Sequence, residues 1–489
     1  MNRRLKRKTT PGSSSAGVGA RPGLEPAWAS YGPTDVPYLR TFFRRLAPAW
    51  LDHVALLRGF APPARKRGLT WCELGCGQGV TPVFLAATHP DGRFFGIDAM
   101  AAHIHHARQL AREAGIQNAV FHEADFAAAR GLDLPKLDYI VAHGVYSWID
   151  SDSQEALRRI IDERLARGGL VYVRYNALPG WAQDLALRQV LFEFGRSLKG
   201  DGVTRVTAAA RTVAALVGAQ APALRGSRAK ALAEFDRHYL AHEYLGSSWR
   251  PLYVTELRAA MAKIGLVPVG SAQLVQNYDS FVLGQAARKA LEGIDDDDLR
   301  ELARDVLLDN GFRSDVFTRG ARRLDETERI CRLNESSFML AKPAAAIAFD
   351  AATPGGTLKF DNDASRRIIA ELAGGPRRLT SIRRGSVSRR DLLANALTLC
   401  AAEALWPVEP RGAPARGLVE AIYDRLGGPA ELLFLPLPSG TAVAAEPGLL
   451  RRLRDGLSLD DYPGWRDFLA AHGFGASAAE TGKANVGKR

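Results

Sequence analysis

The sequence predicts an α/β fold whose main domain is a doubly wound, Rossmann-like parallel sheet. Short apolar runs alternate with helical stretches from about residue 69 to residue 176, which is the pattern of repeated βαβ units. A glycine-rich stretch, Gly75 to Gly79, follows the first apolar run, and the second run ends on Asp98. The chain has 489 residues, of which 46% are hydrophobic, so it is long enough for two or three domains.

Five strands and the helices between them account for the first part of the sheet. The predicted strands are 69–75, 93–98, 119–125, 137–142 and 169–176, and the predicted helices include 101–114 and 153–166. Residues 185–242 carry Ala, Leu and Arg at helical spacing, with breaks at Gly200 and near Pro222, and predict a helical insertion. A helix near 254–264, a sixth strand at 266–272 and a seventh strand at 312–319 predict that the sheet resumes after the insertion.

The pattern changes from about residue 335, which predicts a separate small and mostly helical domain. Helices at 363–373 and 388–404 are bounded by breaks rich in Pro and Gly. The basic run at 377–390, R-R-L-T-S-I-R-R-G-S-V-S-R-R, fits either a DNA-binding helix–turn–helix arrangement or a solvated loop of a partner-binding module. We favour recognition of protein over nucleic acid, and we interpret the net charge of +12 as a solvated basic surface.

The amino-terminal end and the cysteines argue against several classes of protein. Residues 1–17 include a basic cluster, but no apolar core follows it, so they predict neither a secretory signal nor a membrane anchor. The four cysteines are too few and too scattered for a disulfide framework or a tetrahedral metal site. We therefore expect a cytoplasmic protein without a membrane span, a zinc site or an iron–sulfur cluster.

The glycine-rich loop has the composition of a ligand-binding turn. It reads W-C-E-L-G-C-G-Q-G, and Gly75, Gly77 and Gly79 lack the Cβ atom that would keep a ligand away from the backbone. The helix that follows offers free N–H groups to a carboxylate. Asp98, one crossover helix later, can accept both hydroxyls of a ribose, as in dinucleotide-binding folds. Glycine-rich turns and strand-end aspartates also occur without a ligand, because both residue types favour turns.

Together these residues resemble the cofactor loop of class I S-adenosylmethionine-dependent methyltransferases. The spacing is G-x-G-x-G with Glu73 before it, whereas a nicotinamide-binding loop reads G-x-G-x-x-G and needs no acidic residue there. In the methyltransferase family this acidic position lies near the amino-acid end of the cofactor. The third strand end, here Asp125 and Phe126, places an acidic acceptor for the adenine amine beside an apolar ring contact. The resemblance implies S-adenosylmethionine as cofactor, and the residues proposed for its binding are Glu73, Gly75, Cys76, Gly77, Gly79, Asp98, Ala99, Met100, Asp125, Phe126 and His143.

Four further stretches make the resemblance more specific. They read Y-G-P-T-D-V-P-Y at 31–38, H-G-V-Y-S-W-I at 143–149, Y-N-A-L-P-G-W at 175–181 and H-E-Y-L-G-S-S-W-R-P-L-Y at 242–253. These stretches resemble bacterial methyltransferases with a methyltransferase regulatory domain, a family that includes protein-lysine methyltransferases acting on outer-membrane proteins. The likeness covers about residues 28–330 and, more weakly, the C-terminal region, which is winged-helix-like in those enzymes. It implies protein-lysine N-methylation.

The expected domain boundaries follow from the composition and the resemblance. They are a disordered basic tail at 1–27, an S-adenosylmethionine-binding core at 28–182, a helical insertion or regulatory domain at 183–252, completion of the methyltransferase fold at 253–330, a winged-helix-like domain at 335–475 and a disordered tail at 476–489.

The methyl acceptor requires a different set of residues. A methyl group passes from a sulfonium to an amine in one displacement, so alignment matters more than acid–base catalysis. A lysine amine must still be neutral, and an apolar aromatic channel favours the neutral form. The candidates for this channel are Tyr146, Trp148, Tyr31 and Tyr38, with ordinary core packing as the alternative for each ring. His143 can accept a proton, but a hydrogen bond from this strand-end histidine to the backbone is the favoured interpretation, and no residue qualifies as a certain general base.

Other acceptors fit the sequence less well. Adenine methylation normally uses an Asn/Asp-Pro-Pro-aromatic tetrad after the fourth strand, where this chain has H-G-V-Y at 143–146, and no Pro-Cys pair is placed there for a covalent cytosine mechanism. A small-molecule acceptor stays open, because the insertion at 185–242 can serve as a lid. A non-catalytic cofactor-binding or DNA-binding scaffold is the last alternative, and the intact glycine-rich loop argues against it.

Overall fold

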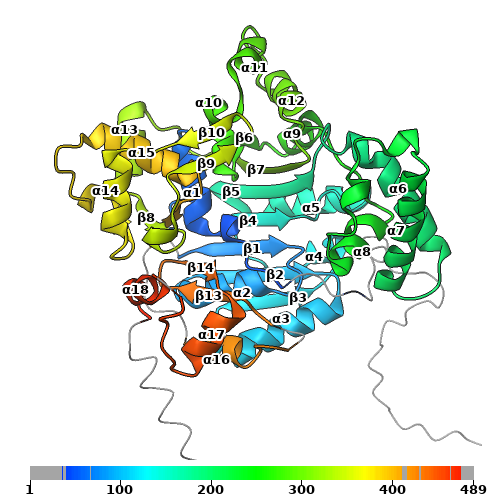
Figure 1. Ribbon diagram of the computed structural model, residues 1–489, viewed down its shortest axis with the longest axis horizontal. Helices are drawn as coiled ribbons and strands as arrows, with labels where there is room; N and C mark the ends of the chain where they lie inside the picture. The colour runs from blue at the N-terminus through cyan, green and yellow to red at the C-terminus, as the bar shows by residue number, and fades with distance from the viewer. Residues whose placement is uncertain are drawn as a thin grey trace, which may run out of the picture.

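A seven-stranded sheet forms the centre of the protein (Figure 1). The computed structural model describes Val36 and residues 40–65, 68–409, 416–428, 431–462 and 464–474, and the structural statements below concern these residues. The strands are β1 (Thr70–Leu74), β2 (Arg93–Asp98), β3 (Ala119–Glu123), β4 (Leu137–His143), β5 (Leu165–Asn176), β6 (Val267–Ser271) and β7 (Phe312–Thr318). They lie in the order β3-β2-β1-β4-β5-β7-β6, and β7 runs antiparallel to both of its neighbours.

The sheet confirms the predicted α/β fold and its seven predicted strands. The main difference is at β5, which begins at Leu165 instead of near residue 169, because Leu165 pairs with Leu137 of β4 across an irregular register. β1 lies between β2 and β4, so successive strands are added on one side of β1 up to β3 and on the other side from β4 onward. The carboxyl end of β1 is therefore the topological switch point of the sheet. Open α/β sheets bind ligands in the crevice at such a switch point.

Helices cover both faces of the sheet, so strand residues alternate between two apolar cores. One face is covered by α1 (Pro48–Leu57), α2 (Val80–Thr88) and α3 (Ala101–Glu113), and the other by α4 (Phe126–Ala129), α5 (Ser151–Arg164) and α9 (Val254–Ala262). Trp71 and Tyr139 belong to the first core, whereas their neighbours Cys72 and Ile140 belong to the second. Burial on both faces explains why the central strands read as nearly continuous apolar runs.

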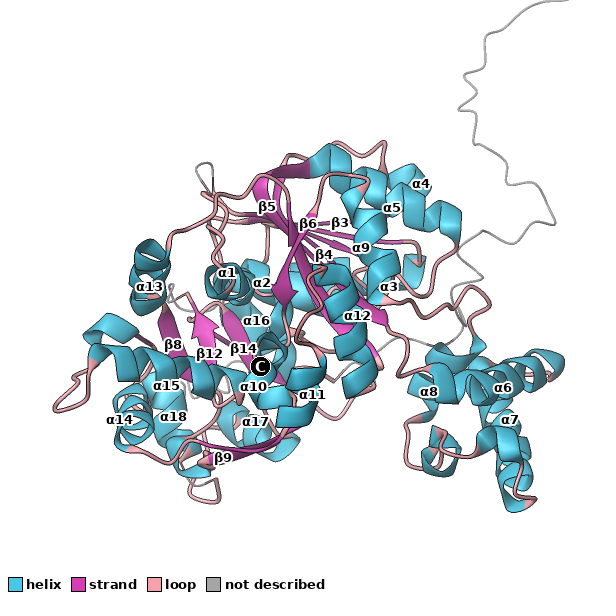
Figure 2. Cartoon of the chain, turned by 90° about the horizontal axis from the view of Figure 1, so that it is seen from above, coloured by secondary structure: helices cyan, strands magenta, loops and turns pink. Residues whose placement is uncertain are grey.

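The predicted helical insertion forms a bundle with an apolar core of its own (Figure 2). Its main helices are α6 (Leu185–Ser197), α7 (Gly202–Gly218) and α8 (Arg237–Leu245). Leu191, Val206 and Leu240, one from each helix, are buried in this core. In Figure 2 the three helices stand away from those that cover the sheet. The sheet resumes after the bundle with α9 and β6, as the sequence predicts.

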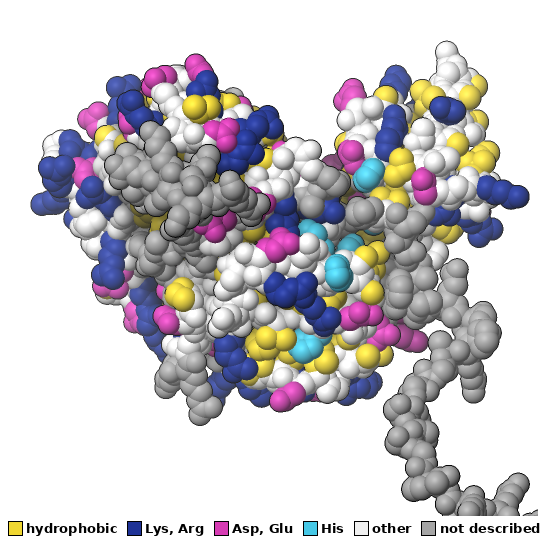
Figure 3. Space-filling view, turned by 90° about the horizontal axis from the view of Figure 1, so that it is seen from below, with side chains coloured by type: hydrophobic (Ala, Val, Ile, Leu, Met, Phe, Trp, Pro, Cys, Tyr) yellow, Lys and Arg dark blue, Asp and Glu magenta, His cyan; other side chains and the backbone are white. Residues whose placement is uncertain are grey.

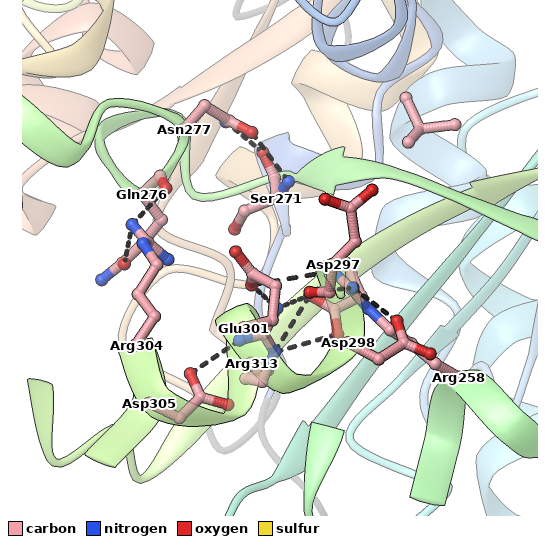
Figure 4. Close-up of polar contacts among 12 residues, drawn as sticks. Arg258, Ser271, Gln276, Asn277, Asp297, Asp298, Glu301, Arg304, Asp305 and Arg313 are labelled. Carbon is pink, nitrogen blue, oxygen red and sulfur yellow. Dashed lines mark hydrogen bonds and ion pairs between the residues drawn. The ribbon is translucent and has the colours of Figure 1, made fainter. Parts of the chain in front are cut away.

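A network of ion pairs attaches α12 (Asp297–Leu308) to β7 (Figure 4). The guanidinium of Arg313 donates to Asp305 at 2.6 Å, to Glu301 at 2.8 Å and to Asp315 at 2.9 Å. Arg313, Asp305 and Asp315 are all buried. A buried charge is tolerated when it is paired and hydrogen-bonded, so these contacts fix α12 against the sheet.

The C-terminal region packs against the face of the sheet that α1, α2 and α3 cover. Two short helices, α10 (Asp279–Val282) and α11 (Gln285–Ala290), lie before α12 in the chain. The helices of the C-terminal region are α13 (Glu326–Glu335), α14 (Asp363–Leu372), α15 (Arg389–Ala401), α16 (Arg416–Tyr423), α17 (Pro447–Arg454) and α18 (Trp465–Ala471). Its strands are β8 (Ser337–Leu340), β9 (Asp350–Thr353), β10 (Gly356–Lys359), β11 (Arg377–Arg378), β12 (Leu405–Val408), β13 (Phe434–Leu437) and β14 (Thr441–Ala444). Helices α14 and α15 confirm the two predicted there.

Strands β11, β8 and β12 form a small sheet, the β13–β14 hairpin contacts α2, and α16 contacts α3. One continuous apolar core extends from α1, α2 and α3 into this region. The winged-helix-like arrangement of this region stays a prediction. The predicted tails at 1–27 and 476–489 lie outside the described residues.

The surface seen from below carries mixed charge (Figure 3). Lys and Arg side chains are spread over this face with Asp and Glu side chains among them. Within the described ranges, no helix combines the length and the apolar character that crossing a membrane requires.

Candidate active site

The loop between β1 and α2 adopts a conformation that requires glycine. Gly75, Gly77 and Gly79 have φ values of +77°, +51° and +73°, a region that residues with a side chain rarely adopt. A Cβ atom on Gly75 would lie 2.3 Å from Cγ2 of Val145, and one on Gly79 would lie 2.3 Å from Cβ of Ala107. The loop can therefore pass close to Val145, after β4, and to Ala107, in α3, only because Gly75 and Gly79 have no side chains.

Asp98 connects the ends of β1 and β2. Its carboxylate accepts hydrogen bonds from the backbone N–H of Gly77 at 2.8 Å and of Met100 at 2.9 Å, and Nδ1 of His103 lies 3.2 Å from Oδ1. Ala99 and Met100 are half-buried beside it. The strand-end aspartate thus orders both loops at the switch point, and it lies where a ribose acceptor is predicted.

Glu73 contributes a buried carboxyl group with an unmet hydrogen-bonding capacity. The residue is 3% exposed, and its Oε2 atom has no partner among the described residues. Burial, followed by the charge of Asp98, raises the pKa of Glu73 well above its usual value. A buried polar atom without a partner is costly, so this position fits a ligand that brings a donor, such as an amine.

A cavity lies between this loop and the chain segment before α1. The residues that line it are Thr41, Phe43, Glu73, Gly75, Cys76, Gly77, Gln78, Val80, Thr81 and His143. Burial raises the pKa of the Cys76 thiol well above its usual value, so this side chain is a neutral wall of the cavity and not a nucleophile. The glycine backbone, the unpaired atom of Glu73 and the carboxylate of Asp98 together fit the amino-acid and ribose parts of S-adenosylmethionine.

His143 forms an aromatic wall of this cavity. Its ring stacks on Phe43 with 3.9 Å between centroids, and its Nδ1 atom lies 3.0 Å from the hydroxyl oxygen of Tyr172. Burial lowers the pKa of His143 well below its usual value, and the charges of Arg174 and Arg45 act in the same direction. The imidazole is therefore neutral. Its hydrogen-bond partner is the side chain of Tyr172, whereas the sequence favoured the backbone, and its role as a proton acceptor stays a prediction.

The other predicted residues lie in varied surroundings. Asp125 accepts a hydrogen bond from the N–H of Ala128 at 2.8 Å and so caps α4, and Phe126 is buried beside it. Tyr146 is 1% exposed, and its hydroxyl accepts a hydrogen bond from Arg158 at 2.5 Å, which is the position of a core residue. Their roles at the cofactor and at the acceptor stay predictions.

Trp148 is half-buried, and the two amino-terminal tyrosines are not described. The Trp148 ring lies 6.4 Å from that of Trp249, which in turn lies 5.1 Å from Trp181. Tyr31 and Tyr38 lie outside the described residues, so their predicted place over the crevice has no structural account. Trp148, Trp249 and Trp181 thus form a group of aromatic rings, and the role of Trp148 beside the acceptor stays a prediction.

The structure also brings together buried polar residues near the carboxyl ends of β4 and β5 that the sequence analysis did not single out. Asn176, the last residue of β5, donates from Nδ2 to Oε1 of Glu243 at 2.9 Å, and both side chains are buried. The backbone N–H of Asn176 donates to Oγ of Ser147, just after β4, at 3.0 Å. Glu243 lies in the quoted stretch H-E-Y-L and Asn176 in Y-N-A-L. An acidic and an amide residue next to tyrosines in these stretches were the sequence features that could have identified the pair.

Comparisons with known proteins agree with this geometry. Residues 72–171 match the sequence family described as "Methyltransferase domain", and residues 236–319 match the one described as "Predicted methyltransferase regulatory domain". The uncharacterized protein sll1526 of Synechocystis sp. is 31% identical over 361 residues, which cover 73% of this chain and 71% of that protein. The uncharacterized protein RP028 of Rickettsia prowazekii is 28% identical over 221 residues, 43% of this chain and 86% of that protein.

A solved structure shares nearly the whole fold. PKMT2 from Rickettsia typhi, determined in complex with AdoHcy, aligns with a TM-score of 0.65 and 20% sequence identity over 93% of each chain. The fold, the glycine-rich loop and the matched families define a class I S-adenosylmethionine-dependent methyltransferase, and S-adenosylmethionine is its cofactor. The chain is a methyltransferase with a predicted methyltransferase regulatory domain, and it belongs to the same family as sll1526.

Replacing Asp98 by alanine should weaken binding of S-adenosylmethionine and of AdoHcy by about 10- to 100-fold, because a charged acceptor is lost and the Gly77 and Met100 amides lose their partner. Isothermal titration calorimetry measures both dissociation constants. The control is Asp91→Ala, an exposed residue in the turn before the same strand, which should bind as the wild type does. Equal affinities in all three proteins would contradict the assigned role of Asp98.

Proposed function

We propose that the protein methylates the side-chain amine of lysine residues in another protein. The observation that carries the proposal is a buried carboxylate in an aromatic segment at the carboxyl end of β5. Glu243 is 7% exposed and bonded to Asn176, and its segment also supplies Trp249, which packs near Trp148 and Trp181. The resemblance of this segment and of 143–149 to protein-lysine methyltransferases, and the fold shared with PKMT2, support the same acceptor.

These groups suit a long side chain with a terminal ammonium group. A carboxylate and aromatic faces both attract a cation, while removal from water favours the neutral amine that can react. When bound, S-adenosylmethionine supplies a methyl group on a positively charged sulfur. The lysine side chain attacks that methyl group with the lone pair of its nitrogen, which is free only after the ammonium has lost a proton. The acceptor therefore needs a nearby group that can take this proton.

The Glu243 carboxylate can take that proton. Burial raises the pKa of Glu243 to about 7, against the opposing effects of the Asn176 hydrogen bond and of the charges on Arg228, Arg174 and Arg188. A general base is most effective when its pKa lies near the working pH. Glu243 would hold the proton on its carboxyl group while the neutral amine is methylated, and would release it to solvent afterwards.

The acceptor class is tested with labelled methyl donor and a host lysate. Wild-type protein should transfer label to material that protease removes and nuclease does not, and acid hydrolysis followed by mass spectrometry should identify methylated lysine. Asp98→Ala should transfer far less, because it binds the cofactor poorly. Label that is sensitive to nuclease or extractable as a small molecule would contradict a protein acceptor, and label on another amino acid would contradict lysine.

The substitution Glu243→Gln should lower kcat by about 100-fold near neutral pH, because the amide cannot take the proton. In the wild type, kcat should rise with pH through about 7, as the Glu243 carboxyl ionises. The variant should lack this rise and should recover activity only at alkaline pH, where solvent takes the proton. A pH profile of kcat measures both effects.

The matched control is Glu234→Gln, an exposed glutamate on the segment before α8, which should keep the wild-type profile. A Glu243→Gln protein that binds the cofactor normally and retains the rise through pH 7 would contradict the role of Glu243 as proton acceptor.

A further inference from the structure

One wall of the cofactor cavity comes from the segment just before α1. Thr41 and Phe43 line the cavity together with the glycine-rich loop. The backbone N–H of Phe43 donates to Oγ1 of Thr81 in α2 at 3.1 Å, and its ring stacks on His143. The wall has little regular structure of its own, since only the short turn Arg44–Leu46 separates Phe43 from the residue before α1. Its position must therefore be set by contacts with other parts of the protein.

Two arginines that follow Phe43 reach a single carboxylate in the C-terminal region. Arg45 donates from Nη2 to Oε1 of Glu403 at 2.5 Å, and Arg44 donates to Oε2 of the same side chain. The Arg44 guanidinium also lies 4.9 Å from the ring centroid of Trp406. Burial tends to raise the pKa of Glu403, but Arg44 and Arg45 outweigh it and lower the pKa, so the carboxylate is ionised.

The turn at Glu403 is formed by backbone hydrogen bonds and does not need a glutamate side chain. The N–H of Glu403 donates to the carbonyl of Cys400, and the N–H of Ala404 donates to the carbonyl of Leu399. This pair of hydrogen bonds is the Schellman motif that ends α15. The position has a φ of +54°, where glycine is the usual residue because a Cβ atom is unfavourable. A glutamate at this place therefore points to a requirement for its carboxylate.

We propose that Glu403 is a positioning residue for cofactor binding. It holds Arg44 and Arg45, and through them it sets Phe43 against His143 at the wall of the cavity. Glu403 is 359 positions from Arg44 in the chain, so through these two arginines the C-terminal region positions a wall of the cofactor site that the amino-terminal half builds. This inference rests on the cofactor site alone and does not depend on which acceptor is methylated.

The test is calorimetric titration of S-adenosylmethionine into Glu403→Gln and Glu403→Gly proteins, together with their thermal unfolding. Both variants should raise the dissociation constant by roughly five- to tenfold, the effect of losing charged hydrogen bonds at a partly exposed site. Glu403→Gly should nevertheless unfold near the wild-type temperature, because glycine relieves the unfavourable turn. A merely structural role would instead lower the unfolding temperature and leave the affinity of the folded protein unchanged.

Two comparisons make the result specific. Glu371→Gln removes an ion pair with Arg383 in the same C-terminal region and should leave the affinity unchanged. In a protein that already carries Arg44→Gln and Arg45→Gln, the further change Glu403→Gln should have no additional effect, because the partners are absent. Dissociation constants within twofold of wild type for both Glu403 variants, or an undiminished effect in the double-arginine background, would overturn the proposal.

Discussion

The carboxylate of Asp98 is the contact on which the geometry of the cofactor site depends. It accepts hydrogen bonds from backbone N–H groups of the loop after β1 and of the loop after β2, and so joins two segments that are separate in the chain. Hydrogen bonds to a charged acceptor are stronger than those between neutral groups, which suits a loop that three glycines leave with little stiffness of its own. The same charge, after burial, raises the pKa of Glu73. An amine placed against Glu73 would favour its ionised form, so an amino-acid end fits this pocket electrostatically.

The remaining parts of the protein converge on this edge of the sheet from three directions. The amino-terminal segment brings Phe43 against His143, the helical insertion brings Glu243 to Asn176, and the C-terminal region brings Glu403 to Arg44 and Arg45. The continuous core between α1, α2, α3 and the C-terminal region makes the last of these contacts possible. Side chains of the accessory regions thereby contact the segments that flank the cofactor site.

The elements that could be predicted from the sequence are those with local signals. Strand runs, the glycine spacing and the aspartate at the end of β2 each depend on residues close together in the chain, and the structure places them as expected. The wall residues could not be found in this way, because Phe43 meets Thr81 across 38 positions and Glu403 meets Arg44 across 359. A turn glutamate with positive φ has no signature in the sequence.

Aromatic residues after a strand are ambiguous for a different reason. A ring near a strand end can face the crevice or the core, and the sequence does not say which. Tyr146 faces the core, where Arg158 satisfies its hydroxyl, whereas Trp148 lies with Trp249 in a half-buried aromatic group. Glu243 was hidden by a similar ambiguity, because its burial comes from the packing of the insertion against β5, which no local pattern encodes.

A crystal structure of the protein with AdoHcy would locate the cofactor directly. We expect ribose hydroxyls within hydrogen-bonding distance of the Asp98 carboxylate, the amino group of the ligand at Glu73, and the Phe43 ring still against His143. A ligand bound elsewhere, or one in this crevice whose ribose makes no contact with Asp98, would contradict this expectation.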